Sequence, residues 1–160
     1  MLMTLNTREW NEHHSTAIQS DAIQNLEQGQ ILYLPQLAFS LDNDEKNFLT
    51  PEYADPHAKN ISYHAAANKL WGVQNLTDEQ HIRLKRMLDR FSRHALGLIH
   101  HLLPLYAPHL IPARTSYRPV QVSDRKTSYR KDDKRLHVDA FPSAPNQGKR
   151  ILRVFCNINP

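Results

Sequence analysis

Apolar residues recur at helical spacing over one long stretch of the chain, between residues 77 and 104. Thr77 and Gln80 match the capping-box pattern at its start, in which each side chain bonds the backbone N–H of the other residue. Six apolar residues then follow at intervals of three or four: Leu84, Leu88, Phe91, Ala95, Leu98 and Leu102. This spacing predicts one long amphipathic helix that ends near Pro104. Its apolar stripe fits a helix packed on a sheet, and a dimer seam is the alternative.

Two shorter elements are predicted ahead of that helix. Residues 21–28 fit a short helix with Ser20 as its N-cap and Gly29 as its stop. Residues 31–35 form an apolar run closed by proline, which predicts a short strand. We expect this strand to extend the main sheet.

Residues 40–75 show no clear period. We expect an irregular connection there, with one turn of helix near Phe48 and partial helix within residues 60–72. Long connections of this kind are often functional, so this one could act as a lid or a substrate loop.

Alternating, strand-like patterns dominate the last third of the chain. Three such stretches cover residues 115–122, 136–141 and 150–158. Helices first and strands last predict an α+β chain in which the helices pack against a sheet.

Composition narrows the class of protein. A chain of 160 residues normally makes one domain with its own core. The single cysteine, Cys156, excludes an internal disulfide and is typical of a reducing compartment. The amino terminus has no apolar run that would predict a secretory signal, and no stretch approaches the ~18 apolar residues that span a bilayer. We therefore expect a soluble, cytoplasmic protein.

The charge is unevenly distributed along the chain. The net charge is +4, but residues 1–113 hold 9 Lys/Arg against 12 Asp/Glu, and residues 114–160 hold 11 against 4. A basic carboxyl-terminal part is expected if the substrate is anionic, and a solvated basic surface is the alternative.

One pair of side chains in the basic part suggests a metal site. Side chains two residues apart on a strand point to the same face, so His137 and Asp139 would project together. An imidazole and a carboxylate so placed can supply two ligands of the 2-His-1-carboxylate triad that holds non-haem Fe(II). With 10 His and 10 Asp among 160 residues, about 0.6 His-x-Asp pairs are expected by chance. A strand-end pair bonded to its neighbours is therefore the alternative.

The residues around this pair resemble the Kdo hydroxylase family. The resemblance is carried by HVDAFPS at residues 137–143, by Pro145 and Gly148, and by RILRVFCNINP at residues 150–160. It is most specific over residues 127–160. Members of that family are Fe(II)- and 2-oxoglutarate-dependent dioxygenases that hydroxylate 3-deoxy-manno-octulosonic acid (Kdo) in the inner core of bacterial lipopolysaccharide.

The resemblance implies a fold and a ligand set. It implies amino-terminal helices packed on a double-stranded β-helix, the jelly-roll or cupin-like barrel, with residues 1–113 as the helical part and residues 114–160 as the first barrel strands. His137 and Asp139 would be the first two iron ligands. The third ligand would be a later histidine, followed by an arginine for 2-oxoglutarate. Because His137 is the last histidine here, the chain looks like the amino-terminal part of such an enzyme, a single-domain fragment with an incomplete barrel, and we expect it to be inactive alone.

Further site residues follow from the last predicted strand. Leu152, Val154, Cys156 and Ile158 would form one apolar face. If that face packs on the long helix, Arg153 and Asn157 look into the barrel, where they could hold a carboxylate of 2-oxoglutarate or of the sugar acid. The alternative is that Arg153 reaches out to the rim.

Basic residues between the strands are candidates for the substrate. Arg130, Lys131 and Arg135 could contact phosphate or carboxylate groups of Kdo-lipid A. They would also draw the protein to the anionic inner face of the inner membrane without insertion.

A non-enzymatic function is the competing hypothesis. A basic β-domain could bind an anionic polymer, either nucleic acid or glycan, without any metal. Nucleic acid would require exposed aromatics among the basic residues, and Tyr117 and Tyr129 are few, so no nucleic-acid partner is expected.

Overall fold

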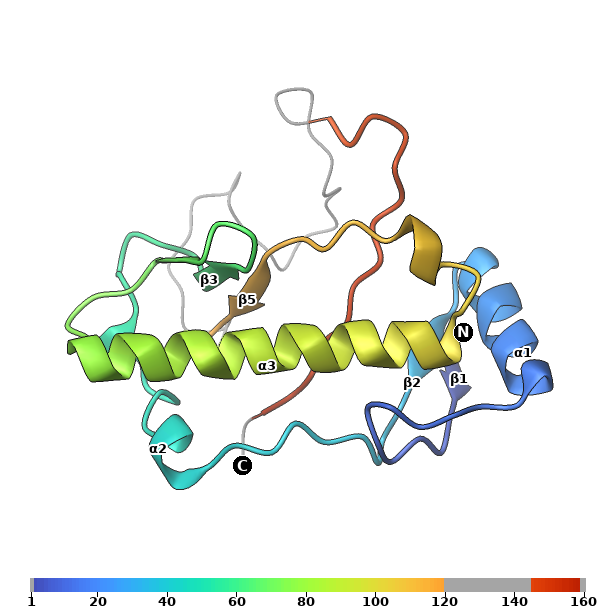
Figure 1. Ribbon diagram of the computed structural model, residues 1–160, viewed down its shortest axis with the longest axis horizontal. Helices are drawn as coiled ribbons and strands as arrows, with labels where there is room; N and C mark the ends of the chain where they lie inside the picture. The colour runs from blue at the N-terminus through green and yellow to red at the C-terminus, as the bar shows by residue number, and fades with distance from the viewer. Residues whose placement is uncertain (1, 120–144, 159–160) are drawn as a thin grey trace.

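The computed structural model describes residues 2–119 and 145–158 (Figure 1). One long helix, α3 (Asp78–Leu102), runs through the centre, with a sheet beside one half of it and a helix and two short strands beside the other. The remaining elements are β1 (Leu2–Thr4), α1 (Thr16–Glu27), β2 (Ile31–Tyr33), α2 (Asn43–Lys46), the 3-10 helices Pro51–Tyr53 and Ala107–His109, β3 (Ile61–His64), β4 (Lys69–Trp71) and β5 (Thr115–Tyr117). None of the helices within these two ranges is long and apolar enough to cross a membrane.

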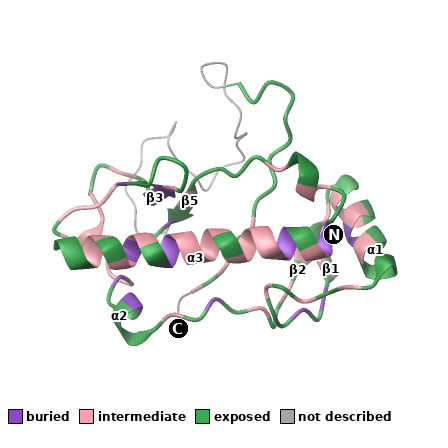
Figure 2. Cartoon of the chain, in the orientation of Figure 1, coloured by how far each residue is buried: buried purple, intermediate pink, exposed green. Residues whose placement is uncertain are grey.

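The predicted long helix and its cap are confirmed. Thr77 Oγ1 accepts from the Gln80 backbone N–H at 3.2 Å, and the Gln80 side chain accepts from the Thr77 N–H at 2.9 Å. The buried residues of α3 are Leu84, Met87, Leu88, Leu98, Ile99 and Leu102, and Figure 2 shows buried positions, in purple, at intervals along the helix. The predicted stripe therefore faces the interior, and the sheet packs on it.

The sheet beside α3 has the order β4-β3-β5, and all its pairs are antiparallel. Ile61, Tyr63, Leu70 and Tyr117 are buried between this sheet and α3. They form the first hydrophobic cluster together with Phe39, Phe48, Leu84, Met87 and Leu88. The predicted strand over residues 115–122 is confirmed for Thr115–Tyr117, and residues 120–122 lie outside the described ranges.

The expectation of partial helix within residues 60–72 is wrong, because this stretch is the β3–β4 hairpin. The three alanines that suggested helix lie in the turn, where the Asn68 N–H donates to the Ala65 carbonyl at 3.0 Å. Asn68 takes a positive φ of 46°, and the His64 ring accepts from the Ala67 N–H. The left-handed conformation at Asn68 reverses the chain. The predicted turn of helix near Phe48 is present as α2.

The second hydrophobic cluster lies around the carboxyl-terminal half of α3. It consists of Leu5, Ala22, Leu98, Ile99, Leu102 and Leu103. Here α1 starts earlier than predicted, because Ser15 rather than Ser20 is its N-cap and accepts from the Ile18 N–H. Strand β2 is where we expected it, but it pairs in parallel with β1 in a separate two-stranded sheet.

Residues 150–158 are not assigned as a strand, contrary to expectation. They still alternate: Val154, Cys156 and Ile158 are half-buried, whereas Phe155 between them is 83% exposed. Val154 packs against the second cluster, and Cys156 and Ile158 pack against the first. This carboxyl-terminal segment therefore crosses α3 and touches both clusters (Figure 1).

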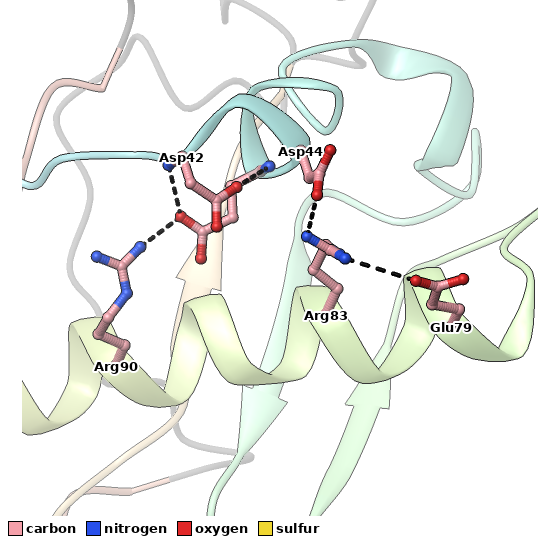
Figure 3. A network of polar contacts seen from close by, with 6 residues as sticks. Asp42, Asp44, Glu79, Arg83 and Arg90 are labelled. Atoms are coloured by element: carbon pink, nitrogen blue, oxygen red, sulfur yellow. Dashed lines mark hydrogen bonds and ion pairs between the residues drawn. The ribbon is translucent and has the colours of Figure 1, made fainter.

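An ion-pair network fixes the start of the predicted irregular connection to α3 (Figure 3). Asp42 and Glu45 form a capping box around α2, at 2.7 and 3.1 Å. Arg90 of α3 pairs with the buried Glu45, and Arg83 pairs with Asp44. A buried carboxylate is costly without such a partner, so α2 depends on α3 for its position.

Tyr117 gives a prediction on stability. Its hydroxyl donates to the Phe48 carbonyl at 2.8 Å, and burial raises the pKa of Tyr117 to about 12. Tyr117→Phe should cost about 1 kcal/mol at neutral pH through loss of that hydrogen bond. Because the pKa is raised in the folded state, the stabilisation is complete below pH ~10 and is lost as the pH rises through ~12, by about 2–3 kcal/mol.

The measurement is urea unfolding of both proteins between pH 8 and 11.5. The wild type should lose stability more steeply than Tyr117→Phe above pH ~10. Tyr33→Phe, at a side chain that is 50% exposed, is the control. Identical pH profiles for wild type and Tyr117→Phe would contradict the prediction.

Candidate functional site

The predicted iron ligands cannot be placed. His137 and Asp139 lie within residues 120–144, outside the described ranges, and so do Arg130, Lys131 and Arg135. In residues 2–119 and 145–158, no group of three or more His, Cys, Asp or Glu side chains could hold a metal ion. His137 and Asp139 remain the candidate iron ligands, because an imidazole and a carboxylate are the ligand types that hold non-haem Fe(II).

Arg153 and Asn157 are the two predicted site residues that the structure describes. Both alternate with the half-buried residues of the carboxyl-terminal segment, so both lie on its exposed side. The expected division into two faces is confirmed from Val154 onward and is wrong for Leu152, which is 39% exposed. Their role toward 2-oxoglutarate remains a prediction.

An anchor holds the carboxyl-terminal segment at its start. The Arg150 guanidinium pairs with Glu27 at the end of α1, and the Tyr106 hydroxyl donates to the same carboxylate. The Tyr106 hydrogen bond and then the Arg150 pair hold the pKa of Glu27 below its ordinary value. This pair joins residues that are 123 positions apart in the sequence. It fixes the start of the segment that carries Arg153 and Asn157.

Cys156 is a packing residue in this arrangement. Its side chain contacts the first cluster, and burial raises the pKa of the thiol above its ordinary value, against an opposing backbone hydrogen bond from Phe39. A raised thiol pKa disfavours the thiolate that a nucleophile needs. Cys156 therefore contributes packing, as expected for a member of the apolar face of this segment.

Four histidines outside the predicted pair, His13, His14, His94 and His101, contact other side chains. The His13 and His101 rings meet edge to face at 4.4 Å, and His14 Nε2 lies 3.3 Å from the Thr7 hydroxyl. His94 of α3 is half-buried, its ring centroid lies 5.4 Å from that of Trp10, and burial and nearby arginines lower its pKa. Helical periodicity could not reveal this contact, because Trp10 comes from a loop before α1.

The family model for 3-deoxy-D-manno-oct-2-ulosonic acid (Kdo) hydroxylase matches residues 9–160. The chain belongs to the Kdo hydroxylase family. The match covers all seven of the candidate site residues, including those outside the described ranges, so the resemblance at residues 137–160 extends back to residue 9.

Solved structures of a Kdo hydroxylase agree with this assignment. The chain is 40% identical to the Kdo hydroxylase KdoO, a non-haem Fe(II) α-ketoglutarate-dependent dioxygenase, in complex with α-ketoglutarate and Fe(III), with a TM-score of 0.81. It is 42% identical to the cobalt(II) complex and 41% identical to the apo structure, both with a TM-score of 0.82. A search of curated proteins gave no match.

The matches also define how much of the family fold is present. Each alignment covers 89% of this chain and 47% of the solved chain. The chain therefore spans about half the length of these Kdo hydroxylases. The mixed helix and sheet architecture that we expected is confirmed by the same similarity.

Proposed function

We propose that this chain is part of an Fe(II)- and 2-oxoglutarate-dependent dioxygenase that hydroxylates Kdo in the inner core of lipopolysaccharide, with Kdo-lipid A as the substrate. The observation that carries the proposal is the family match over residues 9–160, together with 40% identity to KdoO. The relatives were crystallised with Fe(III), cobalt(II), α-ketoglutarate or succinate, which supports the same metal and co-substrate here.

Within this proposal the chain is one domain with two parts. Residues 1–113 supply the helices that pack against the barrel, together with β3 and β4, which share a sheet with β5. Residues 114–160 supply the first barrel strands, in a jelly roll completed by sequence that the longer relatives have. The extended carboxyl-terminal segment supports this arrangement: it packs on α3 with alternate side chains, as a barrel strand would.

The residues of the chain take distinct roles. His137 and Asp139 hold Fe(II). The third ligand comes from the part of the relatives' length that this chain does not span, because no histidine follows His137 within the chain. Bound Fe(II) supplies activation of oxygen for hydroxylation of the sugar, with 2-oxoglutarate as the co-substrate that becomes succinate. Arg153 and Asn157, on the side of the segment turned away from the clusters, hold a carboxylate of 2-oxoglutarate.

Basic residues of the carboxyl-terminal part orient the substrate. Arg130, Lys131 and Arg135 attract phosphate or carboxylate groups of Kdo-lipid A. The excess of 11 Lys/Arg over 4 Asp/Glu in residues 114–160 supports a cytoplasmic protein that lies at the inner face of the inner membrane.

The test uses the full-length gene product. Anaerobic addition of Fe(II) and 2-oxoglutarate should give a weak visible charge-transfer band, and air with a Kdo-lipid acceptor should then yield succinate. A protein that binds anionic polymers without metal would give neither signal. Absence of the band and of succinate would refute the oxygenase.

A further inference from the structure

A hollow of about 440 Å³ lies between the loop that joins β1 to α1 and the second half of α3. This volume is within the range of sites that take a small organic molecule, roughly 300–1,000 Å³. The loop passes beside α3 in Figure 1, and the Trp10 ring contacts the Phe91 and His94 rings of the helix. Residues 8–11 of the loop line the hollow on one side, and Arg93, His94 and Gly97 of α3 line it on the other.

The aromatic wall of the hollow is fixed by contacts behind it. Trp10 Nε1 donates to the Ala38 carbonyl at 2.9 Å. The Trp10 ring also meets the Phe39 and Phe91 rings edge to face, with centroids 6.4 and 5.8 Å away. A ring held by a hydrogen bond and two edge contacts keeps its orientation, so this wall is formed before any ligand enters.

His94 completes this wall as a neutral ring. Its centroid lies 5.4 Å from that of Trp10, and the two ring planes are 37° apart. Its Nδ1 is buried and has no hydrogen-bond partner in the described part of the chain. A charged ring would bury an N–H donor there, and burial, more than the nearby arginines, lowers the pKa of His94. The wall therefore adds no further cation to the hollow at neutral pH.

Gly97 keeps the hollow open on the side of α3. Glycine is among the least favourable residues inside a helix, and Gly97 lies well within α3. A Cβ atom at this position would meet only the Trp10 carbonyl oxygen, at 3.6 Å, which is an ordinary contact. Close packing therefore does not require a glycine here, whereas a longer side chain would occupy the hollow.

Two arginines line the hollow with most of their donors unused. Arg8 Nε donates to Gln36 Oε1 at 2.8 Å, and Arg93 Nε donates to Asp89 Oδ2 at 3.0 Å. Neither guanidinium has another hydrogen bond within residues 2–119 and 145–158, so the terminal nitrogens of both can donate to a ligand. Planar donors of this kind match the two oxygens of a carboxylate.

One carboxylate in the wall is unused as well. Glu9 lines the hollow, and its side chain has no hydrogen bond or ion pair among the described residues. The neighbouring Glu12 is committed to the loop, because it accepts from the backbone N–H groups of Arg8 and Glu9 at 2.7 and 3.3 Å. A ligand with anionic groups alone would face the Glu9 carboxylate, which repels it. The hollow therefore favours a ligand that carries a positive charge beside its negative one.

We propose that this hollow binds a free α-amino acid with an apolar side chain. The carboxylate of the ligand pairs with Arg8 and Arg93, and its ammonium group pairs with Glu9. Its side chain lies against the Trp10 ring, in the space that Gly97 leaves. A simple anion satisfies the arginines alone, and a peptide holds its two terminal charges further apart. All the groups involved lie within residues 8–11 and 93–97, so this binding does not depend on the proposed oxygenase chemistry.

The experiment is calorimetric titration of the full-length gene product with L-phenylalanine and L-leucine, in EDTA so that no iron captures the amino acid. Two analogues of L-phenylalanine test the charges: 3-phenylpropionate lacks the ammonium group, and phenethylamine lacks the carboxylate. Each should bind at least about tenfold more weakly than L-phenylalanine, because each loses one charged contact. Bound L-phenylalanine should also raise the melting temperature, because it binds the folded chain alone.

Variants of the hollow locate the binding. Arg8→Gln and Glu9→Gln should each weaken L-phenylalanine binding by about tenfold, whereas Arg86→Gln, at an exposed arginine of α3, should leave it unchanged. Gly97→Leu should abolish binding by filling the hollow. Gly97→Ala is its matched control: the single Cβ atom fits, so this variant should keep binding and raise the melting temperature.

Binding of 3-phenylpropionate or of phenethylamine as tight as that of L-phenylalanine would overturn the proposal. So would unchanged affinity in Gly97→Leu, or no binding of either amino acid at up to about 10 mM. If Gly97→Leu lowers the melting temperature, Arg8→Gln and Glu9→Gln decide, and unchanged affinity in both refutes the site. His137→Ala should lose the iron band but bind L-phenylalanine as the wild type does, so the iron site and the hollow are measured separately.

Discussion

Replacing His137 or Asp139 by alanine in the full-length gene product is expected to abolish both the charge-transfer band and the formation of succinate. Each change removes one protein ligand from a facial triad that has only three. Loss of an outer-shell partner already costs ~10–100-fold in metal affinity or activity, so loss of a ligand should cost more than that. The band at saturating Fe(II), measured before any turnover, separates weak metal binding from slow chemistry.

Matched variants control for the loss of a histidine or an acid elsewhere. His109→Ala and Asp21→Ala change exposed side chains and should leave the band and the succinate yield unchanged. Melting curves of all four variants should coincide with that of the wild type. A full band in His137→Ala or Asp139→Ala would show that the iron is held by other residues, and the assignment of the pair would be wrong.

Gly72→Ala should be the most destabilising alanine substitution at a glycine of the described chain, at about 3 kcal/mol. Gly72 has a φ of +70°, and a Cβ atom there would lie 2.3 Å from the Asn60 carbonyl oxygen and 3.1 Å from the Ala58 Cβ. The positive φ costs roughly 1–2 kcal/mol for an L residue. The clash adds an overpacking cost of about 1–3 kcal/mol, because the nearest atom is backbone and cannot rotate away.

Gly29→Ala separates these two costs. Gly29 has almost the same φ, +76°, but nothing lies within 4 Å of its added Cβ. It should therefore cost only the strain, roughly 1–2 kcal/mol. Urea unfolding of the three proteins gives both differences, and equal losses for the two variants would show that the backbone at Asn60 moves freely.

The features that local chemistry determines were the ones that sequence could predict. Helix α3 was found because its cap and its apolar stripe both lie within the helix itself. Strand β2 and the stop at Gly29 were likewise local signals. The partner of β2 was not predictable, because pairing with β1 joins residues 29 positions apart.

The hairpin shows why the rest was missed. Three consecutive alanines favour helix by intrinsic propensity, yet residues 65–67 form a turn between strands that α3 buries on one side. Tertiary contacts outweighed local preference there. The sequence signal that could have corrected the prediction was the presence of Asn68 and Gly72 on either side of residues 69–71. Both residue types accept a positive φ, which is typical of turns.

The candidate site divides in the same way. The alternation of Val154, Cys156 and Ile158 was visible in the sequence and is confirmed by packing. Which groups Arg153 and Asn157 contact in a whole Kdo hydroxylase depends on the half of the relatives' length that this chain does not span, so no pattern within this chain could decide it. The iron ligands remain a prediction from spacing and from family membership.

The route of the carboxyl-terminal segment across α3 has a consequence for synthesis on the ribosome. Val154 covers the second cluster and Ile158 the first, so the second cluster stays open until Val154 leaves the exit tunnel and the first until Ile158 does. The nascent chain therefore exposes two hydrophobic surfaces, one at each end of α3, before the carboxyl-terminal segment covers them. Such surfaces attract chaperones, and they aggregate when translation stalls.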